Sequence, residues 1–183
     1  RFDGHDFLQA AADQGAAAAL WAKELPAHSP IPLIQVEDTL VALQDLAAAW
    51  RRELGVKLVA VTGSNGKTTT KDLISAVLGV RYQVHRTHGN LNNHIGLPLT
   101  LLSMPTGTEV AVVEMGMSRA GEIARLSEIA TPDTAVITNI GEAHLEFFGS
   151  REAIADAKLE IREGLSPDGV LFVDGDEPLL QER

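Results

Sequence analysis

The sequence predicts an α/β fold in which a mostly parallel sheet is flanked by helices, preceded by part of a smaller α/β domain. Two observations lead to this prediction. From Lys57 onward, short apolar runs alternate with amphipathic helix-like stretches, and a glycine-rich loop joins the first run to the first of these stretches. The 183 residues are 45% hydrophobic, which is enough to form a packed core.

The segment before this alternation is organised differently. A helix-like stretch covers residues 5–14, and residues 16–21 form either a short strand or a continuation of that helix. Three prolines then break any helix before a strand-like run at 33–36, and Asp38 can cap a helix that ends near Leu54. We therefore expect a domain boundary near Asp38.

The alternating part supplies most of the expected elements. Strands are expected over residues 58–62, 82–85, 110–114, 134–138 and 170–173. Helices are expected over residues 67–78, from about 96, over 121–129 and over 151–163. Strands separated by helices pair in parallel, so the carboxyl ends of these strands should share one edge of the sheet.

The charge balance limits the kinds of partner. Lys and Arg number 15 against 25 Asp and Glu, a net charge of -10, which opposes the basic footprint of a nucleic-acid-binding protein. There is no apolar run long enough to cross a bilayer, so we expect a cytoplasmic protein without membrane insertion. The absence of cysteine leaves His, Asp, Glu, Thr and Lys for any chemistry.

The glycine-rich loop is typical of a nucleotide-phosphate site. A loop between a buried strand and a helix directs backbone N–H groups and the positive helix end toward an anion. Lys67 can reach the β- and γ-phosphates, and the Thr68 hydroxyl can bind magnesium, although the glycine spacing is more compressed than in the usual motif. The expected nucleotide contacts are Gly63, Ser64, Asn65, Gly66, Lys67, Thr68 and Thr69.

Three further side chains are candidates for the same site. Glu114 ends an apolar strand at the edge where ligand sites form in such sheets, and magnesium prefers hard oxygen ligands, although an acid there can also be merely solvated. His144 follows the next strand and is either a metal ligand or a surface residue. Lys158 falls on the apolar stripe of its helix, so it either reaches back to solvent or is a functional lysine with a shifted pKa or a carbamylated one.

At these residues the sequence resembles the Mur ligase family, the ATP-dependent amide-forming enzymes of peptidoglycan precursor synthesis, along nearly the whole chain. The motifs that carry the resemblance are residues 62–69 (TGSNGKTT), 89–98 (GNLNNHIGLP), 114–117 (EMGM) and 143–150 (AHLEFFGS). It is nearest to the member that adds D-alanyl-D-alanine. Residues 2–7 (FDGHDF) resemble the end of the family's UDP-sugar-binding N-terminal domain.

The resemblance implies a domain organisation. Residues 1–37 would be the C-terminal part of the N-terminal domain, and residues 38–183 an incomplete central ATP-binding domain. The C-terminal ligase domain would lie outside this chain. A monomer is expected.

The resemblance also implies site roles and ligands. Lys67 and Thr68 would serve ATP and the first of two Mg²⁺ ions, Glu114 and His144 would bind Mg²⁺, and Lys158 would correspond to a carbamylated lysine that helps to hold metal. The catalytic set is then Lys67, Glu114, His144 and Lys158, and Asn92 and Asn93 are expected to support substrate or metal geometry. The substrates would be UDP-N-acetylmuramoyl-tripeptide and D-alanyl-D-alanine, joined through an acyl phosphate.

Alternative functions remain open at this point. Another Mur-type ligase or a folylpolyglutamate-type ligase would differ in the asparagine loop and in the amino acid used. A non-catalytic ATP-binding module is also possible. A small-molecule kinase or a GTPase is a third alternative, but a GTPase should carry an N-K-x-D-like motif, which Thr138-Asn139-Ile140-Gly141 does not match.

Overall fold

The computed structural model describes residues 3–142, 145–181 and 183. Within it the chain divides into two units, Arg1–Leu43 and Gln44–Arg183. The helix α2 (Thr39–Leu54) begins in the first unit and ends in the second. The expectation that residues 1–37 and 38–183 have separate functional roles stays a prediction.

The first unit is a small α/β arrangement. It contains a 3-10 turn η1 (Gly4–Phe7), the helix α1 (Leu8–Asp13) and two strands, β1 (Ala19–Trp21) and β2 (Leu33–Gln35), which pair in parallel. Of the two alternatives for residues 16–21, the structure shows the strand, which covers Ala19–Trp21. A hollow of about 540 Å³ in this unit is lined by both polar and apolar side chains, among them His5, Phe7 and Trp21.

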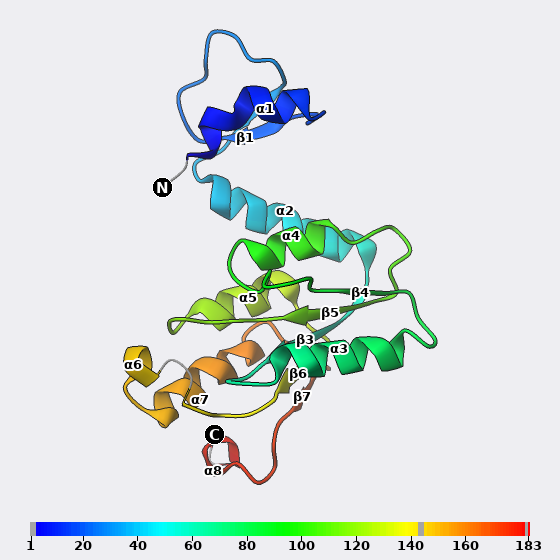
Figure 1. The fold of residues 1–183 in the computed structure, drawn as a ribbon, viewed down its shortest axis with the longest axis vertical. Helices are drawn as coiled ribbons and strands as arrows, with labels where there is room; N and C mark the ends of the chain where they lie inside the picture. Colours follow the sequence, from blue (N-terminus) through cyan, green and yellow to red (C-terminus); the bar gives the residue numbers. More distant parts are fainter. Residues whose placement is uncertain (1–2, 143–144, 182) are drawn as a thin grey trace. The chain divides into compact units, whose positions relative to one another are not determined.

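The second unit contains a five-stranded sheet with the order β4-β5-β3-β6-β7, in which every described pairing is parallel (Figure 1). Its strands are β3 (Lys57–Thr62), β4 (Val84–Arg86), β5 (Val110–Glu114), β6 (Thr134–Ile137) and β7 (Val170–Phe172). Its helices after α2 are α3 (Lys67–Leu78), α4 (Gly96–Leu102), α5 (Glu122–Ala130), α6 (Leu145–Phe148), α7 (Arg151–Leu159) with the 3-10 turn η2 (Glu160–Arg162), and α8 (Pro178–Gln181). The predicted fold class is confirmed.

The two faces of this sheet are covered by different helices. Leu58 and Ala60 of β3 belong to a large core with buried residues of α2, α4, α5 and α7. Val61, the next residue along β3, belongs instead to a smaller cluster packed by Ile74 and Leu78 of α3. Since successive side chains of a strand point to opposite faces, α3 covers one face and the other helices cover the opposite one.

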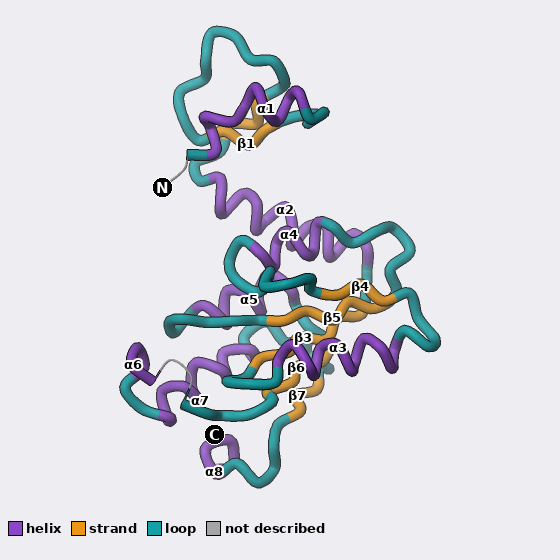
Figure 2. The backbone as a smooth tube through the Cα atoms, in the orientation of Figure 1, coloured by secondary structure: helices purple, strands orange, loops and turns teal. Residues whose placement is uncertain are grey.

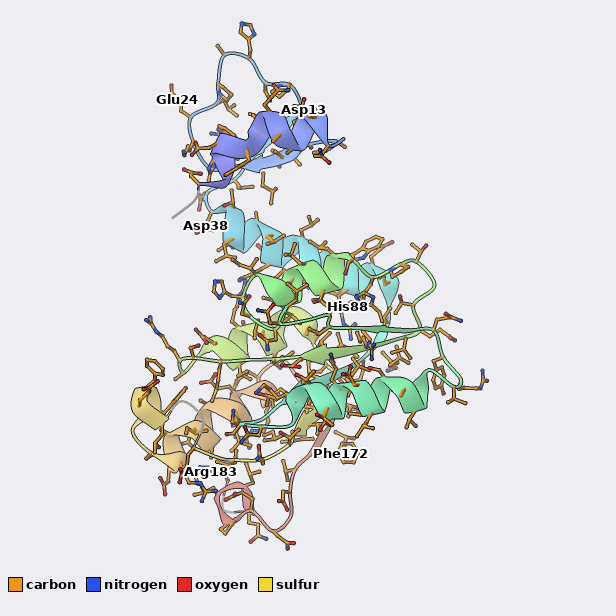
Figure 3. All side chains as sticks on the ribbon, in the orientation of Figure 1. Asp13, Glu24, Asp38, His88, Phe172 and Arg183 are labelled. Atoms are coloured by element: carbon orange, nitrogen blue, oxygen red, sulfur yellow. The ribbon has the colours of Figure 1, made fainter. Side chains whose placement is uncertain are left out.

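The helix α2 begins where the sequence predicts. Oδ1 of Asp38 accepts hydrogen bonds from the N–H groups of Leu40 and Val41, at 2.7 and 3.0 Å. These N–H groups lie in the first turn, where the helix offers them no carbonyl acceptor. Figure 3 labels Asp38 at this helix start.

Three details differ from expectation. The strand β4 begins at Val84 rather than Tyr82, because the Tyr82 N–H still donates to the Leu78 carbonyl and so extends the end of α3. The expected helix over 151–163 tightens after Leu159 into the 3-10 turn η2. The short helix α6 was not expected, because four residues are too few to show a helical period.

The loops that follow the parallel strands gather at one edge of the sheet. In Figure 2 the loops after β5 and β6 leave the sheet on the left side of the view. The candidate residues at the ends of β3 and β5 are therefore brought together by topology, as expected for an α/β sheet.

Candidate active site

The glycine-rich loop connects the end of β3 to the start of α3. Gly63 has φ +146° and Gly66 has φ +78°, values that favour glycine. A Cβ added to Gly63 would lie 1.9 Å from Oγ1 of Thr138, so only glycine allows the loop to pack this closely on the segment after β6. The first N–H groups of α3 have no acceptor within the helix, which leaves them available to an anion.

The segment after β6 fixes the shape of the loop. The Ser64 N–H donates to the Asn139 carbonyl at 3.1 Å, and the Asn65 N–H donates to Asn139 Oδ1 at 2.9 Å. The Thr138 hydroxyl donates to the Asn65 carbonyl at 2.5 Å, and the Gly141 N–H donates to the Ser64 hydroxyl at 2.8 Å. The amides of Ser64 and Asn65 therefore hold the loop, whereas those of the first turn of α3 are left for an anion.

Lys67 is the first residue of α3 and folds over the loop. Its Nζ donates to the carbonyl of Gly63 at 2.8 Å and to that of Ser64 at 3.4 Å. An ammonium has three donors, so these two contacts leave one for a phosphate oxygen.

Glu114 ends β5 as a buried carboxylate with both oxygens engaged. It is 3% exposed. Oε2 accepts from the Thr68 hydroxyl at 2.9 Å, and Oε1 accepts from Asn92 Nδ2 at 2.8 Å. Glu114 is therefore not merely solvated. Its carboxylate, the Thr68 hydroxyl and the Asn92 side-chain amide meet at the start of α3.

The asparagine loop lies beside this cluster. The side chain of Asn92 contacts Glu114, and the backbone carbonyl of Asn92 accepts a hydrogen bond from the Gly116 N–H at 2.8 Å. Asn93 Oδ1 accepts from the N–H groups of Ile95 and Gly96 and so caps the start of α4. Both asparagines line one pocket, but only Asn92 contacts a candidate metal ligand.

Lys158 lines the same pocket as the two asparagines. It is 2% exposed, and burial together with the positive charge of Lys67 lowers its pKa from 10.5 to about 8. The snorkelling alternative is thereby excluded. The pocket has a volume of about 320 Å³, and its lining includes Lys67, Asn92, Asn93, Glu122 and Lys158.

The element that carries Lys158 is tied firmly to α5. Glu160 accepts from the N–H groups of Gly121 and Ala124 at 2.7 and 3.2 Å, and so caps the start of α5 from another element. The buried hydroxyl of Ser127 donates to the Ile161 carbonyl at 2.5 Å. These contacts fix the helix turn on which Lys158 lies.

His144 lies outside the described residues, so the structure brings together the other candidates without it. Within the described part of the chain, no three His, Asp or Glu side chains cluster as a metal site. The candidate ligand set there consists of the Thr68 hydroxyl and the Glu114 carboxylate. No described helix is long and apolar enough to cross a membrane.

Comparison with known proteins agrees with this arrangement. Residues 61–183 match the family model described as the Mur ligase middle domain. The chain belongs to the Mur ligase family. A UDP-N-acetylmuramoyl-tripeptide–D-alanyl-D-alanine ligase from Bacillus subtilis is 62% identical over 183 residues, covering 99% of this Mur ligase chain and 40% of the relative.

Solved structures extend the similarity to three dimensions. MurF from Thermotoga maritima in complex with ADP is 40% identical, with a TM-score of 0.91, and the match covers all of this chain and 42% of that one. MurF from Acinetobacter baumannii is 38% identical with a TM-score of 0.90, over all of this chain and 40% of that one. This Mur ligase chain thus spans about 40% of the length of the relatives that it matches.

Several residues of the site in this Mur ligase chain were not found from the sequence. Asn139 anchors the loop, Glu160 caps α5, and Lys71 and Thr87 are buried behind Glu114. Each acts through a partner at least 16 positions away in the chain, so no local pattern reveals it. Lys71 follows Lys67 by one helical turn, but this spacing alone does not reveal that its side chain is buried.

Proposed function

We propose that this chain is the ATP-binding part of a ligase that joins D-alanyl-D-alanine to UDP-N-acetylmuramoyl-tripeptide in peptidoglycan precursor synthesis. The observation that carries the proposal is the contact of Thr68 and Asn92 with buried Glu114. Asn92 also lines a pocket together with Lys67 and Lys158. The names of the relatives and the ADP complex of one of them support the choice of substrates and nucleotide.

The proposed organisation follows from the same resemblance. Residues 1–37 belong to the UDP-sugar-binding domain, residues 38–183 to the central ATP-binding domain, and the ligase domain that binds the dipeptide is a further part of the whole protein. We place this protein in the cytoplasm as a monomer, where it serves cell wall biogenesis and hence cell shape and division.

The donor set fits magnesium. Thr68 Oγ1 and Glu114 Oε2 lie 2.9 Å apart, both are hard oxygen donors, and Asn92 fixes the second carboxylate oxygen. Thr68 and Glu114 would hold one ion, and His144 with a carbamylated Lys158 a second. Bound Mg²⁺ supplies charge neutralisation on the phosphates.

The reaction needs an activated carboxylate, because a carboxylate is a poor electrophile toward an amine. A carboxylate oxygen of the tripeptide attacks the γ-phosphorus of ATP, ADP leaves, and an acyl phosphate forms. The amine of D-alanyl-D-alanine then attacks the acyl carbon, phosphate leaves, and the amine loses a proton. Lys67 stabilises the negative charge that gathers on the γ-phosphate, and the first N–H groups of α3 orient it.

Lys158 is suited to carbamylation, the reaction of a neutral amine with CO₂. With a pKa of about 8, roughly a tenth of the amine is neutral at pH 7, far more than for an ordinary lysine. The resulting carbamate would exchange a buried positive charge for a negative one that can bind metal. Crystallographic density extending beyond Nζ of Lys158 would establish the modification.

Nucleotide binding tests the proposal most directly. In the whole protein, Lys67→Ala should weaken ATP binding at saturating Mg²⁺ by at least tenfold, because it removes the only loop-borne cation. Isothermal titration calorimetry measures the effect, and Lys23→Ala, a change in the first unit, is the control. Equal affinity in wild type and Lys67→Ala would contradict the proposal.

The choice of acceptor separates this ligase from its alternatives. Phosphate release by the whole protein, with UDP-N-acetylmuramoyl-tripeptide and ATP present, should require D-alanyl-D-alanine. Release driven only by a single amino acid would assign the protein to another Mur-type or folylpolyglutamate-type reaction. ATP binding without any phosphate release would instead indicate a non-catalytic ATP-binding module.

A further inference from the structure

The β-ladder between β4 and β5 is altered at its last step, directly beside Glu114. The Thr87 N–H donates to the Val112 carbonyl at 3.1 Å and continues the parallel pairing of Arg86 with Val112. In an evenly spaced parallel ladder the next bond would run from the Glu114 N–H to the Thr87 carbonyl. Instead, the Glu114 N–H donates to the Thr87 hydroxyl, Oγ1, at 2.9 Å.

The Thr87 carbonyl is occupied by a lysine instead. Nζ of Lys71, one turn after Lys67 in α3, donates to this carbonyl at 2.9 Å. Lys71 and Thr87 are 3% and 0% exposed, respectively. The ammonium therefore takes the acceptor that the ladder would use, and the hydroxyl of the same threonine replaces it.

A buried ammonium is an expensive way to satisfy one carbonyl. Removing a lysine from water costs free energy, and apolar residues of similar volume often replace buried charges at no loss of stability. Partial compensation comes from Asp72, whose Oδ1 lies 3.1 Å from Nζ of Lys71 and 2.9 Å from Nη1 of Arg86. Packing alone does not explain why a lysine lies here.

The exchange of acceptors sets the position of Glu114. Its N–H bonds to a side-chain oxygen rather than to a backbone carbonyl, so β4 and β5 need not close into a regular ladder at this residue. The Glu114 carboxylate is held from its far side by Thr68 and Asn92. Its backbone and its side chain are thus fixed by different partners.

We propose that Lys71 and Thr87 are positioning residues that hold Glu114 at the place where it binds magnesium, a role that rests on the proposed function of Glu114. Neither residue is among those that line the pocket, so both would act through Glu114. Without the ammonium, the Thr87 carbonyl becomes free to take the Glu114 N–H, and the regular ladder draws Glu114 toward β4. Without the hydroxyl, the Glu114 N–H can find a partner only by sharing that carbonyl with Lys71, which also draws Glu114 toward β4.

The dependence of ATP binding on Mg²⁺ tests this role in the whole protein. In Lys71→Met and Thr87→Val, the Mg²⁺ concentration for half-maximal ATP binding should rise about tenfold, as is typical when the outer partners of a metal ligand are removed. Raised Mg²⁺ should restore binding, because the ligands themselves are intact. Thr87→Ser, which keeps the hydroxyl, should stay within about twofold of wild type.

Controls separate positioning from folding. Ser75→Ala removes a hydrogen bond to the Lys71 carbonyl one turn further along α3, and should leave the Mg²⁺ dependence unchanged. Thermal melting should show Lys71→Met and Thr87→Val folded at the assay temperature. If Lys71→Met does not fold, the pair Thr87→Val and Thr87→Ser decides, since both keep the lysine.

Failure of the positioning role of Lys71 and Thr87 can be distinguished from failure of the proposed function. If the wild type shows no Mg²⁺-dependent ATP binding, or if Lys67→Ala binds equally well, the proposed function fails. If these behave as expected while folded Lys71→Met and Thr87→Val match the wild type in Mg²⁺ dependence, the positioning role is overturned. Unfolding of both variants would also overturn it, because the pair would then serve the fold rather than the site.

Discussion

Lys158 shows how one buried residue links the stability of the protein to its chemistry. Its ammonium is removed from water and lies near the charge of Lys67, so the folded protein binds its proton less tightly than the unfolded chain does. The protonated form therefore opposes folding. Carbamylation would remove both the proton and this penalty.

The pH dependence of stability should reveal this residue. The penalty is fully present below a pH of about 8, and it declines as the pH rises from that value to the ordinary pKa of 10.5. In buffer free of CO₂, the free energy of unfolding of wild type relative to Lys158→Met should rise by about 3 kcal/mol over this range. Urea unfolding at several pH values measures it, and parallel curves for the two proteins would contradict the prediction.

At the scale of elements, a small ion network joins α2, β3, the end of α5 and the start of β6. Arg51 of α2 donates to the carbonyls of Ala130 and Thr131, where α5 ends, at 2.8 and 2.9 Å. Asp133, just before β6, accepts from Arg51, from Nζ of Lys57 and from the Leu58 N–H. Arg51 and Asp133 together therefore connect two helices and two strands away from the site.

The pKa of Asp133 reflects this network. Burial alone would raise it, but the hydrogen bonds from Lys57 and Leu58 and the charges of Lys57 and Arg51 outweigh burial, so the pKa lies below its ordinary value of 3.8. The stabilisation is therefore present above a pH of about 3.8 and is lost as the pH falls through the lower, folded pKa.

Asp133→Asn should reduce the free energy of unfolding by about 2 kcal/mol at pH 7, because it removes charge-assisted hydrogen bonds. The difference from wild type should shrink as the pH falls below about 3.8, because the unfolded chain takes up the Asp133 proton before the folded protein does. Urea unfolding at pH 7 and at pH 3 checks this. Asp45→Asn, which breaks an exposed ion pair to Arg125 at 3.6 Å, should change stability by less than about 0.5 kcal/mol. Equal effects of the two variants would contradict the role of the network.

For the whole molecule, we expect a polypeptide of residues 1–183 to form no amide bond. The proposed dipeptide-binding domain is not among these residues, so ADP formation should not be coupled to ligation. Phosphate release and product formation, measured with both substrates and with the whole protein as control, test this. Amide synthesis by the 183-residue polypeptide would refute it.

The sequence predicts much of this molecule because the signals for it are local. Alternating apolar runs and helical stripes give the α/β fold, Asp38 marks the start of α2, and the inward stripe places Lys158 in the interior. The contacts that define the site are not local. Asn92 and Thr68 reach Glu114 from 22 and 46 positions away, and they meet only because the strand order places β5 between β4 and β3.

The sequence does not reveal the positioning residues Lys71 and Thr87 for the same reason, because their contacts are not local. Lys71 lies in a helix whose pattern gives it no distinguishing neighbour, and its burial depends on where β4 ends. Which acceptor the Glu114 N–H uses is decided between two oxygens of Thr87, and no sequence period encodes that choice.

The bonds between the glycine-rich loop and Asn139 also have a consequence for the order in which the protein assembles. The loop is complete at Thr69, yet the amides of Ser64 and Asn65 find their acceptors only on a residue 74 or 75 positions later. Contacts so distant in sequence form late, because a large chain loop must close first. During synthesis, a nascent chain that ends before Asn139 would contain the glycine-rich loop but not the hydrogen bonds that hold its conformation. Nucleotide binding by the nascent chain should therefore begin only after β6 has joined the sheet.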